Sequence, residues 1–145
     1  MENYGVLLPV KSFANAKVRL TSVLSPSERA ALSRSLAERV IQVCEGVPVW
    51  VICEDEEVES WALQLGAEVI RNTQPGLNGA AQTGLSAVAK EGVKRVLITH
   101  ADLIFPEGLL SLFEHDGIVL VPDRHNDGTN VIGLPSDIDF SFKYG

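Results

Sequence analysis

Short apolar runs alternate along this chain with stretches in which apolar residues recur at helical spacing. The runs are rich in Val, Ile and Leu and are bounded by polar or turn-forming residues, a pattern typical of buried strands. We therefore expect strands at Gly5–Val10, Val47–Cys53, Ala67–Arg71, Val93–Thr99, Ile118–Val121 and Asn130–Leu134.

The first helix is predicted by its boundary residues as well as by its periodicity. Ser25 is a suitable N-cap, Pro26 takes the first helical position and Glu28 completes a capping box. Gly46 stops the helix, whose expected apolar stripe consists of Leu32, Leu36, Val40 and Val43.

Helical spacing predicts three more helices. One ends at Gly66, one runs from a cap at Asn78 to Gly92, and a short one begins at Pro106. Their apolar residues are, in order, Val58, Trp61, Ala62 and Leu65; Ala81, Leu85 and Val88; and Leu109, Leu110 and Phe113.

This alternation favours an α/β fold with three layers, in which helices cover both faces of a mostly parallel sheet. The strands are continuous apolar runs, as expected where both faces are covered. A length of 145 residues suits a single domain, 1–145, and a hydrophobic fraction of 46% with 21% charged residues is typical of a globular protein.

Composition excludes several classes of function. No apolar run approaches the roughly 20 residues that span a bilayer, and the N-terminal residues lack the pattern of a signal peptide. We therefore expect a cytoplasmic protein without a membrane partner, in which Cys44 and Cys53 are free, buried thiols. With 12 Lys and Arg against 19 Asp and Glu, and a net charge of -7, the chain lacks the broad positive face that nucleic acid requires.

The basic residues are concentrated near the N-terminus, where six of the 12 lie in residues 1–39. Lys11, Lys17 and Arg19 form a cationic segment in the loop after the first strand. A phosphate is the natural ligand of such a segment, although an ordinary charged loop explains the spacing equally well. The other three are expected on the solvated face of the first helix: Arg29, Arg34 and Arg39.

Several polar residues should converge on one edge of the sheet, because open α/β sheets bind ligands at the carboxyl ends of their strands. Lys11 follows the first strand, Asp102 the fourth, and Asp123 and Arg124 the fifth. Asp102 is well placed to hold Mg²⁺, which favours one or two carboxylates with phosphate oxygens, but capping a helix or closing a turn explains it as well. His100 is expected to be a packed or surface histidine rather than a metal ligand.

A glycine-rich segment, PGLNGAAQTGL, joins a loop to a predicted helix. Gly76 and Gly79 would let backbone N–H groups approach a ligand closely, and Asn78 serves either as the helix cap or as a contact to a base edge. The sequence has no Walker A loop, no GxGxxG fingerprint and no GxSxG elbow, so it offers little support for a dinucleotide site or for serine hydrolysis.

A second polar segment, DRHNDGTNVIGL, combines a turn with the start of a strand. Arg124, Thr129 and Asn130 could all face a phosphate or a carboxylate. A plain hairpin at Asp127-Gly128 explains the turn residues but not this clustering.

Three segments occur in order over nearly the whole chain: LLPVKSFANAKVRL, PGLNGAAQTGL with the later HADL, and VPDRHNDGTNVIGL. Together they resemble the 2-phospho-L-lactate guanylyltransferases of coenzyme F420 biosynthesis and the related bacterial enzymes that accept phosphoenolpyruvate. The resemblance implies a nucleotide-diphospho-sugar-transferase-like, Rossmann-like fold. It also implies Mg²⁺-dependent transfer of GMP from GTP to a phosphorylated three-carbon acid, with release of pyrophosphate.

The resemblance also implies roles for individual residues. Lys11 and Asp102 would carry catalysis, Asp102 as the ligand of Mg²⁺. Contacts to the acceptor are expected from Arg124, Thr129 and Gly145. Contacts to the nucleotide, with Asn78 near the guanine, are expected from Pro9, Val10, Lys11, Lys17, Arg19, Asn78 and Gly79.

The sequence departs from the family in two places. Where the family has ADLP, Leu103 is followed by Ile104 and Phe105 before Pro106. The chain also stops at Gly145, before the family's C-terminal segment with its second metal carboxylate, so we interpret it as C-terminally truncated. Another nucleotidyltransferase of this fold, acting on a sugar phosphate or the molybdenum cofactor, and a non-catalytic nucleotide-binding module stay open. A homodimer is also compatible with the sequence, which identifies no interface.

Overall fold

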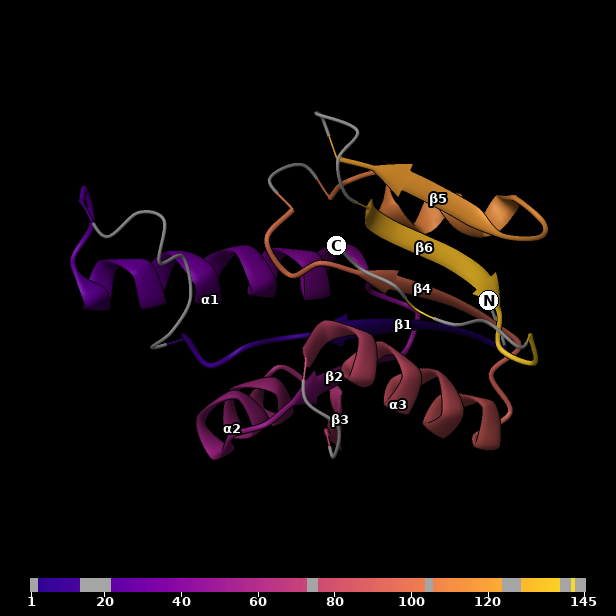
Figure 1. Cartoon of the computed structure of the whole chain (residues 1–145), viewed down its shortest axis with the longest axis horizontal. Helices are drawn as coiled ribbons and strands as arrows, with labels where there is room; N and C mark the ends of the chain where they lie inside the picture. The colour runs from indigo at the N-terminus through magenta and orange to yellow at the C-terminus, as the bar shows by residue number, and fades with distance from the viewer. Residues whose placement is uncertain are drawn as a thin grey trace.

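Six strands form one sheet at the centre of the molecule (Figure 1). The structure is a computed structural model, and it describes residues 3–13, 22–72, 76–103, 106–123, 129–138 and 142. The order of the strands across the sheet is β3-β2-β1-β4-β6-β5. Their bounds are β1 (Tyr4–Pro9), β2 (Val49–Cys53), β3 (Glu68–Arg71), β4 (Arg95–Thr99), β5 (Val119–Pro122) and β6 (Thr129–Pro135).

The direction of the strands determines which residues share an edge. β1 pairs in parallel with β2 and β4, and β2 with β3. β6 pairs antiparallel with both β4 and β5, so β5 runs in the same direction as β4. The carboxyl ends of β1 to β5 and the amino end of β6 therefore meet at one edge of the sheet. The prediction of a mostly parallel α/β sheet is confirmed.

Helices cover both faces of the sheet, as predicted. α1 (Pro26–Val43), α2 (Glu56–Gln64) and the 3₁₀ helix η3 (Leu109–Glu114) share a core with Val6 and Leu8 of β1. α3 (Gly76–Lys90) covers the opposite face and packs with Leu7 of β1. Successive side chains of β1 thus enter different layers, which is why its sequence is a continuous apolar run. None of the described helices is long and apolar enough to cross a membrane.

The capping box predicted for α1 is present. The Ser25 hydroxyl accepts a hydrogen bond from the backbone N–H of Glu28 at 3.2 Å, and the Glu28 carboxylate accepts one from the backbone N–H of Ser25 at 2.8 Å. The hydrogen bond from that backbone N–H holds the pKa of the Glu28 carboxyl below its usual value. The start of α1 is therefore set by local sequence, independently of what the helix packs against.

The face that α1 buries agrees only in part with the predicted one, since Val40 is buried and Val43 packs against the core as predicted. The buried residues are Arg29, Ala37 and Val40, and Leu32 is exposed, because the helix lies on the sheet along the line through these three positions. Arg29 was expected in solvent, but its side chain is only 9% exposed and its Nη1 donates to the Leu24 carbonyl at 3.0 Å. This contact ties the segment before α1 to the helix.

Three other local predictions need correction. Asn78 lies inside α3, which begins at Gly76, so it is not the N-cap of that helix. The short helix expected from Pro106 is a 3₁₀ helix that begins at Leu109. The strands were expected to be covered on both faces, but β5, which lies at one edge of the sheet, is covered on one face only. Leu120 on its other face is 57% exposed.

α3 approaches the sheet closely at Gly84. A Cβ atom at this position would overlap Cδ1 of Ile52 and lie 3.2 Å from Cδ1 of Leu7, and both of those side chains are fully buried. The distance between α3 and the sheet therefore depends on the absence of a side chain at position 84.

We expect Gly84→Ala to destabilise the fold by about 1–2 kcal/mol, because overpacking outweighs the gain in helix propensity. Urea unfolding measures the change, with Ser86→Ala on the exposed side of the same helix as the control. A more stable Gly84→Ala protein would contradict this account of the packing.

Candidate active site

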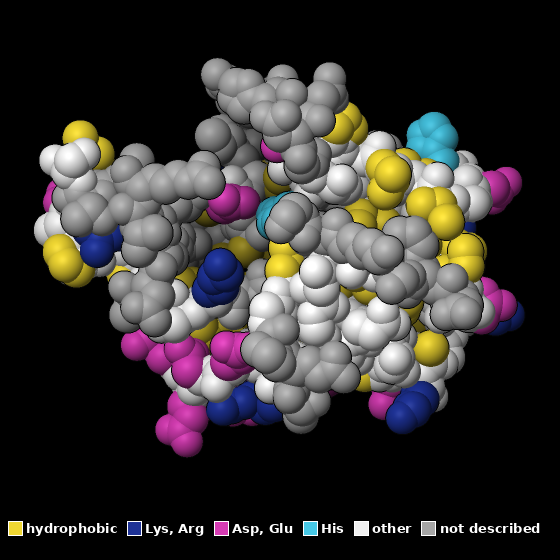
Figure 2. Space-filling model, in the orientation of Figure 1, with side chains coloured by type: hydrophobic (Ala, Val, Ile, Leu, Met, Phe, Trp, Pro, Cys, Tyr) yellow, Lys and Arg dark blue, Asp and Glu magenta, His cyan; other side chains and the backbone are white. Residues whose placement is uncertain are grey.

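The sheet topology brings several of the predicted site residues to one edge. Lys11 lies two residues beyond the end of β1, and Asp102 lies three residues beyond the end of β4. Thr129 opens β6, and because β6 is antiparallel this residue lies at the same edge. Asp123 directly follows β5. Figure 2 shows a hollow at this end of the molecule with basic and acidic side chains around it.

Four of the predicted contact residues lie outside the described residues. They are Lys17 and Arg19 of the cationic segment, Arg124 of the polar turn, and Gly145. Asp127 and Gly128, which predict the hairpin turn, also lie outside them. The roles expected for these residues stay predictions.

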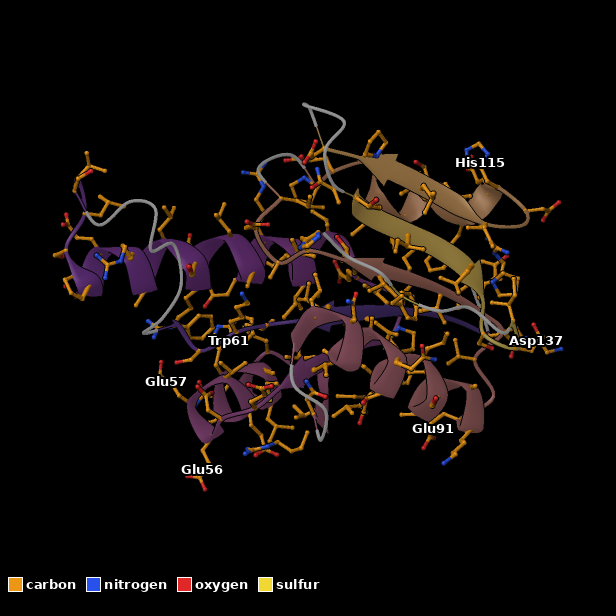
Figure 3. All side chains as sticks on the ribbon, viewed as in Figure 1. Glu56, Glu57, Trp61, Glu91, His115 and Asp137 are labelled. Carbon is orange, nitrogen blue, oxygen red and sulfur yellow. The ribbon has the colours of Figure 1, made fainter. Side chains whose placement is uncertain are left out.

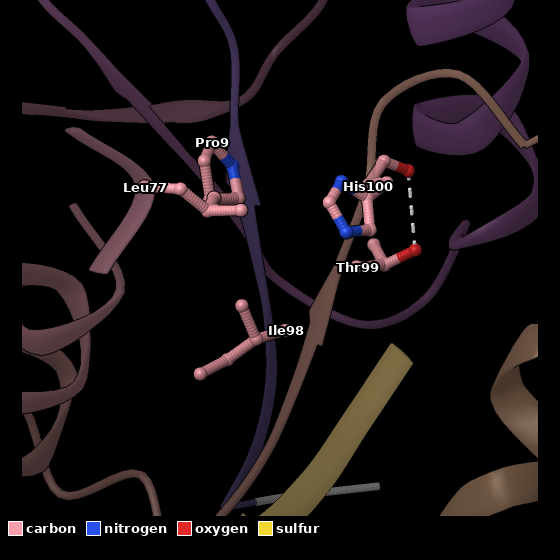
Figure 4. Close-up of a pocket in the computed structure, with 5 residues that line it drawn as sticks. All are labelled: Pro9, Leu77, Ile98, Thr99 and His100. Carbon is pink, nitrogen blue, oxygen red and sulfur yellow. Dashed lines mark hydrogen bonds between the residues drawn. The ribbon is translucent and has the colours of Figure 1, made fainter. Parts of the chain in front are cut away.

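A small hollow lies at the centre of this edge, between β1, β4 and the start of α3 (Figure 4). Its lining residues are Pro9, Leu77, Ile98, Thr99 and His100. Pro9 was predicted to contact nucleotide, and Leu77 stands next to Asn78, which was predicted to lie near the base. The first turn of α3 faces the hollow, so backbone N–H groups that have no partner within the helix lie near it.

His100 joins the end of β4 to the start of β6. Its backbone N–H donates to the Asn130 carbonyl at 3.1 Å, and its ring atom Nε2 lies 2.8 Å from the Thr129 carbonyl oxygen. A carbonyl oxygen only accepts, so Nε2 is the nitrogen that carries hydrogen in this contact. The residue is half-buried, in agreement with the prediction of a packed or surface histidine. The sequence did not predict that its ring connects β4 to β6.

Lys11 is exposed, and the backbone that carries it is anchored two residues later by Phe13. Phe13 is 1% exposed, and its ring meets the Trp61 ring edge-on at a centroid distance of 5.2 Å. The Arg34 guanidinium carbon lies 5.1 Å from the centre of the Phe13 ring. We call Phe13, Trp61 and Arg34 the Phe13 anchor. The sequence did not predict it, because its members come from three separate segments.

One hydrogen bond and one ion pair connect the members of the anchor to the two helices on that face of the sheet. Trp61 Nε1 donates to the Glu38 carboxylate at 3.0 Å, which connects α2 to α1. Arg34 Nη2 lies 3.5 Å from a carboxylate oxygen of Glu57 (Figure 3 labels Glu57 and Trp61). Because Trp61 and Arg34 both contact the Phe13 ring, these contacts hold the described residues after β1, as far as Phe13, against α1 and α2.

Among the described residues at this edge, Asp102 could hold a metal ion only if substrate oxygens supplied further ligands. The carboxylate of Asp102 is exposed, and the described part of the chain contains no group of three or more His, Cys, Asp or Glu side chains that could hold a metal. Mg²⁺ is usually held by one or two carboxylates together with phosphate oxygens and water. Asp102 therefore suits a Mg²⁺ ion that is bound together with a phosphorylated substrate.

The two cysteines are free and buried, as predicted. Burial raises the pKa of Cys44 to about 11. Burial also raises the pKa of Cys53, although the positive charge of Arg71 opposes the shift. Both thiols are therefore neutral near pH 7, and neither provides a thiolate nucleophile.

The Phe13 anchor predicts a stability effect near the site. We expect Phe13→Leu to lower the free energy of unfolding by about 1–2 kcal/mol, because it removes the edge-on ring contact and the cation–π contact. Chemical denaturation measures this, and Leu63→Ala, on the exposed face of α2, should change stability by less than about 0.5 kcal/mol. If Phe13→Leu and the unsubstituted protein had the same free energy of unfolding, the Phe13 anchor would not contribute to stability.

Solved structures define the class of fold. A Desulfovibrio desulfuricans G20 structure, named for a nucleotide-diphospho-sugar transferase, superimposes with a TM-score of 0.78 at 18% identity, over 94% of this chain and 65% of that one. A nucleotidyl transferase from Methanothermobacter gives a TM-score of 0.68 at 14% identity, over 94% and 73% of the two chains. The fold is therefore the nucleotide-diphospho-sugar-transferase-like fold, as expected.

Sequence comparison then defines the family. Residues 4–145 match the family described as "Guanylyl transferase CofC like", and this chain belongs to it. The phosphoenolpyruvate guanylyltransferase of Rubrobacter xylanophilus is 35% identical over 96% of this chain and 73% of its own length. The 3-phospho-D-glycerate guanylyltransferase of Phenylobacterium zucineum is 30% identical over 96% and 70%. The 2-phospho-L-lactate guanylyltransferase of Methanocaldococcus jannaschii is 29% identical over 96% and 63%.

Proposed function

We propose that this protein transfers GMP from GTP to a phosphorylated three-carbon acid and releases pyrophosphate. The relatives are named for phosphoenolpyruvate, 3-phospho-D-glycerate and 2-phospho-L-lactate, all of which belong to that class of acceptor. By this relationship the reaction belongs to coenzyme F420 biosynthesis. The observation that carries the proposal is the convergence of Lys11, the start of α3, Asp102 and Thr129 on one edge of the sheet.

The chemistry of the transfer suits the residues at this edge. A phosphate oxygen of the acceptor attacks the α-phosphorus of GTP, the new P–O bond forms, and the bond to pyrophosphate breaks. This reaction needs no protein nucleophile, and negative charge grows on the oxygens that leave. Catalysis then depends on alignment of the two substrates and on positive groups near the developing charge.

The proposal assigns a role to each group at the edge. Lys11, supported by the Phe13 anchor, neutralises the triphosphate together with Lys17 and Arg19. Pro9 and Val10 form the backbone wall beside the nucleotide, and Asn78 and Gly79 in the first turns of α3 lie near the guanine. Contacts to the phosphate of the acceptor come from Thr129, Arg124 and Gly145.

Asp102 would hold Mg²⁺ at this edge. When bound, Mg²⁺ supplies positive charge that stabilises phosphate oxygens in the transition state. The position of Asp102 supports this assignment, because it lies two residues beyond His100, which lines the hollow.

A substrate panel tests the proposed function. The protein is incubated with GTP, Mg²⁺ and each of 2-phospho-L-lactate, phosphoenolpyruvate and 3-phosphoglycerate, and pyrophosphate release and the guanylylated product are measured. Product with GTP and at least one acceptor supports the proposal, and a preference for CTP or UTP would instead favour a different nucleotidyltransferase. Nucleotide binding without product from any acceptor would favour a binding module.

Asp102→Asn should lower kcat/KM by about 10²-fold or more, because it removes a charge that positions Mg²⁺ and the phosphates. It should also raise the Mg²⁺ concentration required for half-maximal activity. The matched control is Asp137→Asn, because Asp137 is an exposed aspartate that follows β6 at the opposite edge of the sheet (Figure 3). An Asp102→Asn protein with the activity and Mg²⁺ requirement of the unsubstituted protein would remove Asp102 from the site.

A further inference from the structure

We propose that His100 is a positioning residue, which sets the distance between the metal-binding turn at Asp102 and the acceptor-binding end of β6 at Thr129. The inference rests on the proposed function and adds a residue to it. The starting observation is that one side chain connects the ends of two strands that carry different parts of the site.

The paired residues of β4 and β6 end one residue before His100, and His100 continues the contact between the two strands. The paired residues run from Arg95 and Pro135 to Thr99 and Val131. Beyond this pair, the His100 backbone N–H still donates to the Asn130 carbonyl at 3.1 Å. The chain then turns away through Ala101 and Asp102. The ring of His100 extends the connection by one more residue, because its Nε2 lies 2.8 Å from the Thr129 carbonyl.

The other neighbour of Thr129 supplies weaker support. β5 pairs Pro122 with Thr129, and the register between the two strands shifts between Val121 and Pro122. A proline has no N–H to donate, and a register shift leaves the ladder irregular at that point. Among the described residues, the regular contacts to the start of β6 therefore come from the side of β4, where His100 makes the terminal one.

The ring is also restrained by its surroundings. His100 is half-buried and lines the hollow together with Pro9 of β1 and Leu77 of α3, which stand across the gap from it (Figure 4). Because the carbonyl of Thr129 requires hydrogen on Nε2, the contact selects both the orientation and the tautomer of the ring. A side chain held in this way can transmit the position of β4 to the start of β6.

The position of Thr129 matters for the proposed transfer, because the acceptor oxygen must lie in line with the bond that breaks. A misplacement of about 1 Å can cost roughly 10²-fold in rate. His100 would act through Thr129 and would not itself touch the reacting atoms. Removal of the His100 side chain should therefore raise the KM for the acceptor more than the KM for GTP.

The test compares His100→Leu with His100→Gln. We expect His100→Leu to raise the KM for the acceptor about tenfold, the equivalent of one lost hydrogen bond, and to change the KM for GTP by less than about twofold. His100→Gln retains an N–H donor that can reach the Thr129 carbonyl, and it should restore the acceptor KM to within about threefold of the original value. The control is His115→Leu, because His115 is an exposed histidine that follows η3 (Figure 3).

A second measurement separates this inference from the proposed function. Amide hydrogen exchange in the peptide that begins β6 should become about tenfold faster in His100→Leu and should return toward the original rate in His100→Gln. If the unsubstituted protein transfers no GMP, the proposed function fails, and the exchange rates alone test the His100 contact. An unchanged acceptor KM in His100→Leu, or equal increases in both KM values, would overturn the positioning role, as would unchanged exchange.

Discussion

β6 runs antiparallel to β4, while the strands before it are parallel. An antiparallel strand begins where its parallel neighbours end, and this reversal brings Thr129 to the edge that also carries Lys11 and Asp102. Had β6 been parallel, its first residue would lie at the opposite edge of the sheet, about 20 Å away for a strand of this length. The candidate site therefore depends on the hydrogen bonds that pair β4 with β6.

Much of the fold follows from local sequence. The apolar runs predicted the six strands of the sheet to within a few residues, and the central strands are apolar along their length because helices cover both of their faces. The edge strand β5 was predicted by its apolar run as well, although only one of its faces is covered. The start of α1 was equally predictable, since Ser25, Pro26 and Glu28 satisfy the first turn by contacts within four residues. In both cases the determining interactions lie within one segment or follow from its composition.

The parts that the sequence could not predict depend on contacts between distant segments. The burial of Arg29 in place of Leu32 follows from the way α1 lies on the sheet, and helical periodicity alone does not define that angle. The bridge from His100 to Thr129 joins residues 29 positions apart, and the Phe13 anchor joins a loop to two helices. Motif resemblance predicted a set of site residues, but it gave no information about the groups that hold them in position.

The close approach of α3 at Gly84 has a consequence for the substrate end of this helix. Gly76, at its first residue, is eight positions away, or about 12 Å along the axis, and Leu77 lines the hollow. Because α3 is one continuous helix, a larger residue at Gly84 that pushed it away from the sheet would also displace its first turn relative to Pro9. A substitution in the hydrophobic core, far from the hollow, would then weaken the binding of the nucleotide.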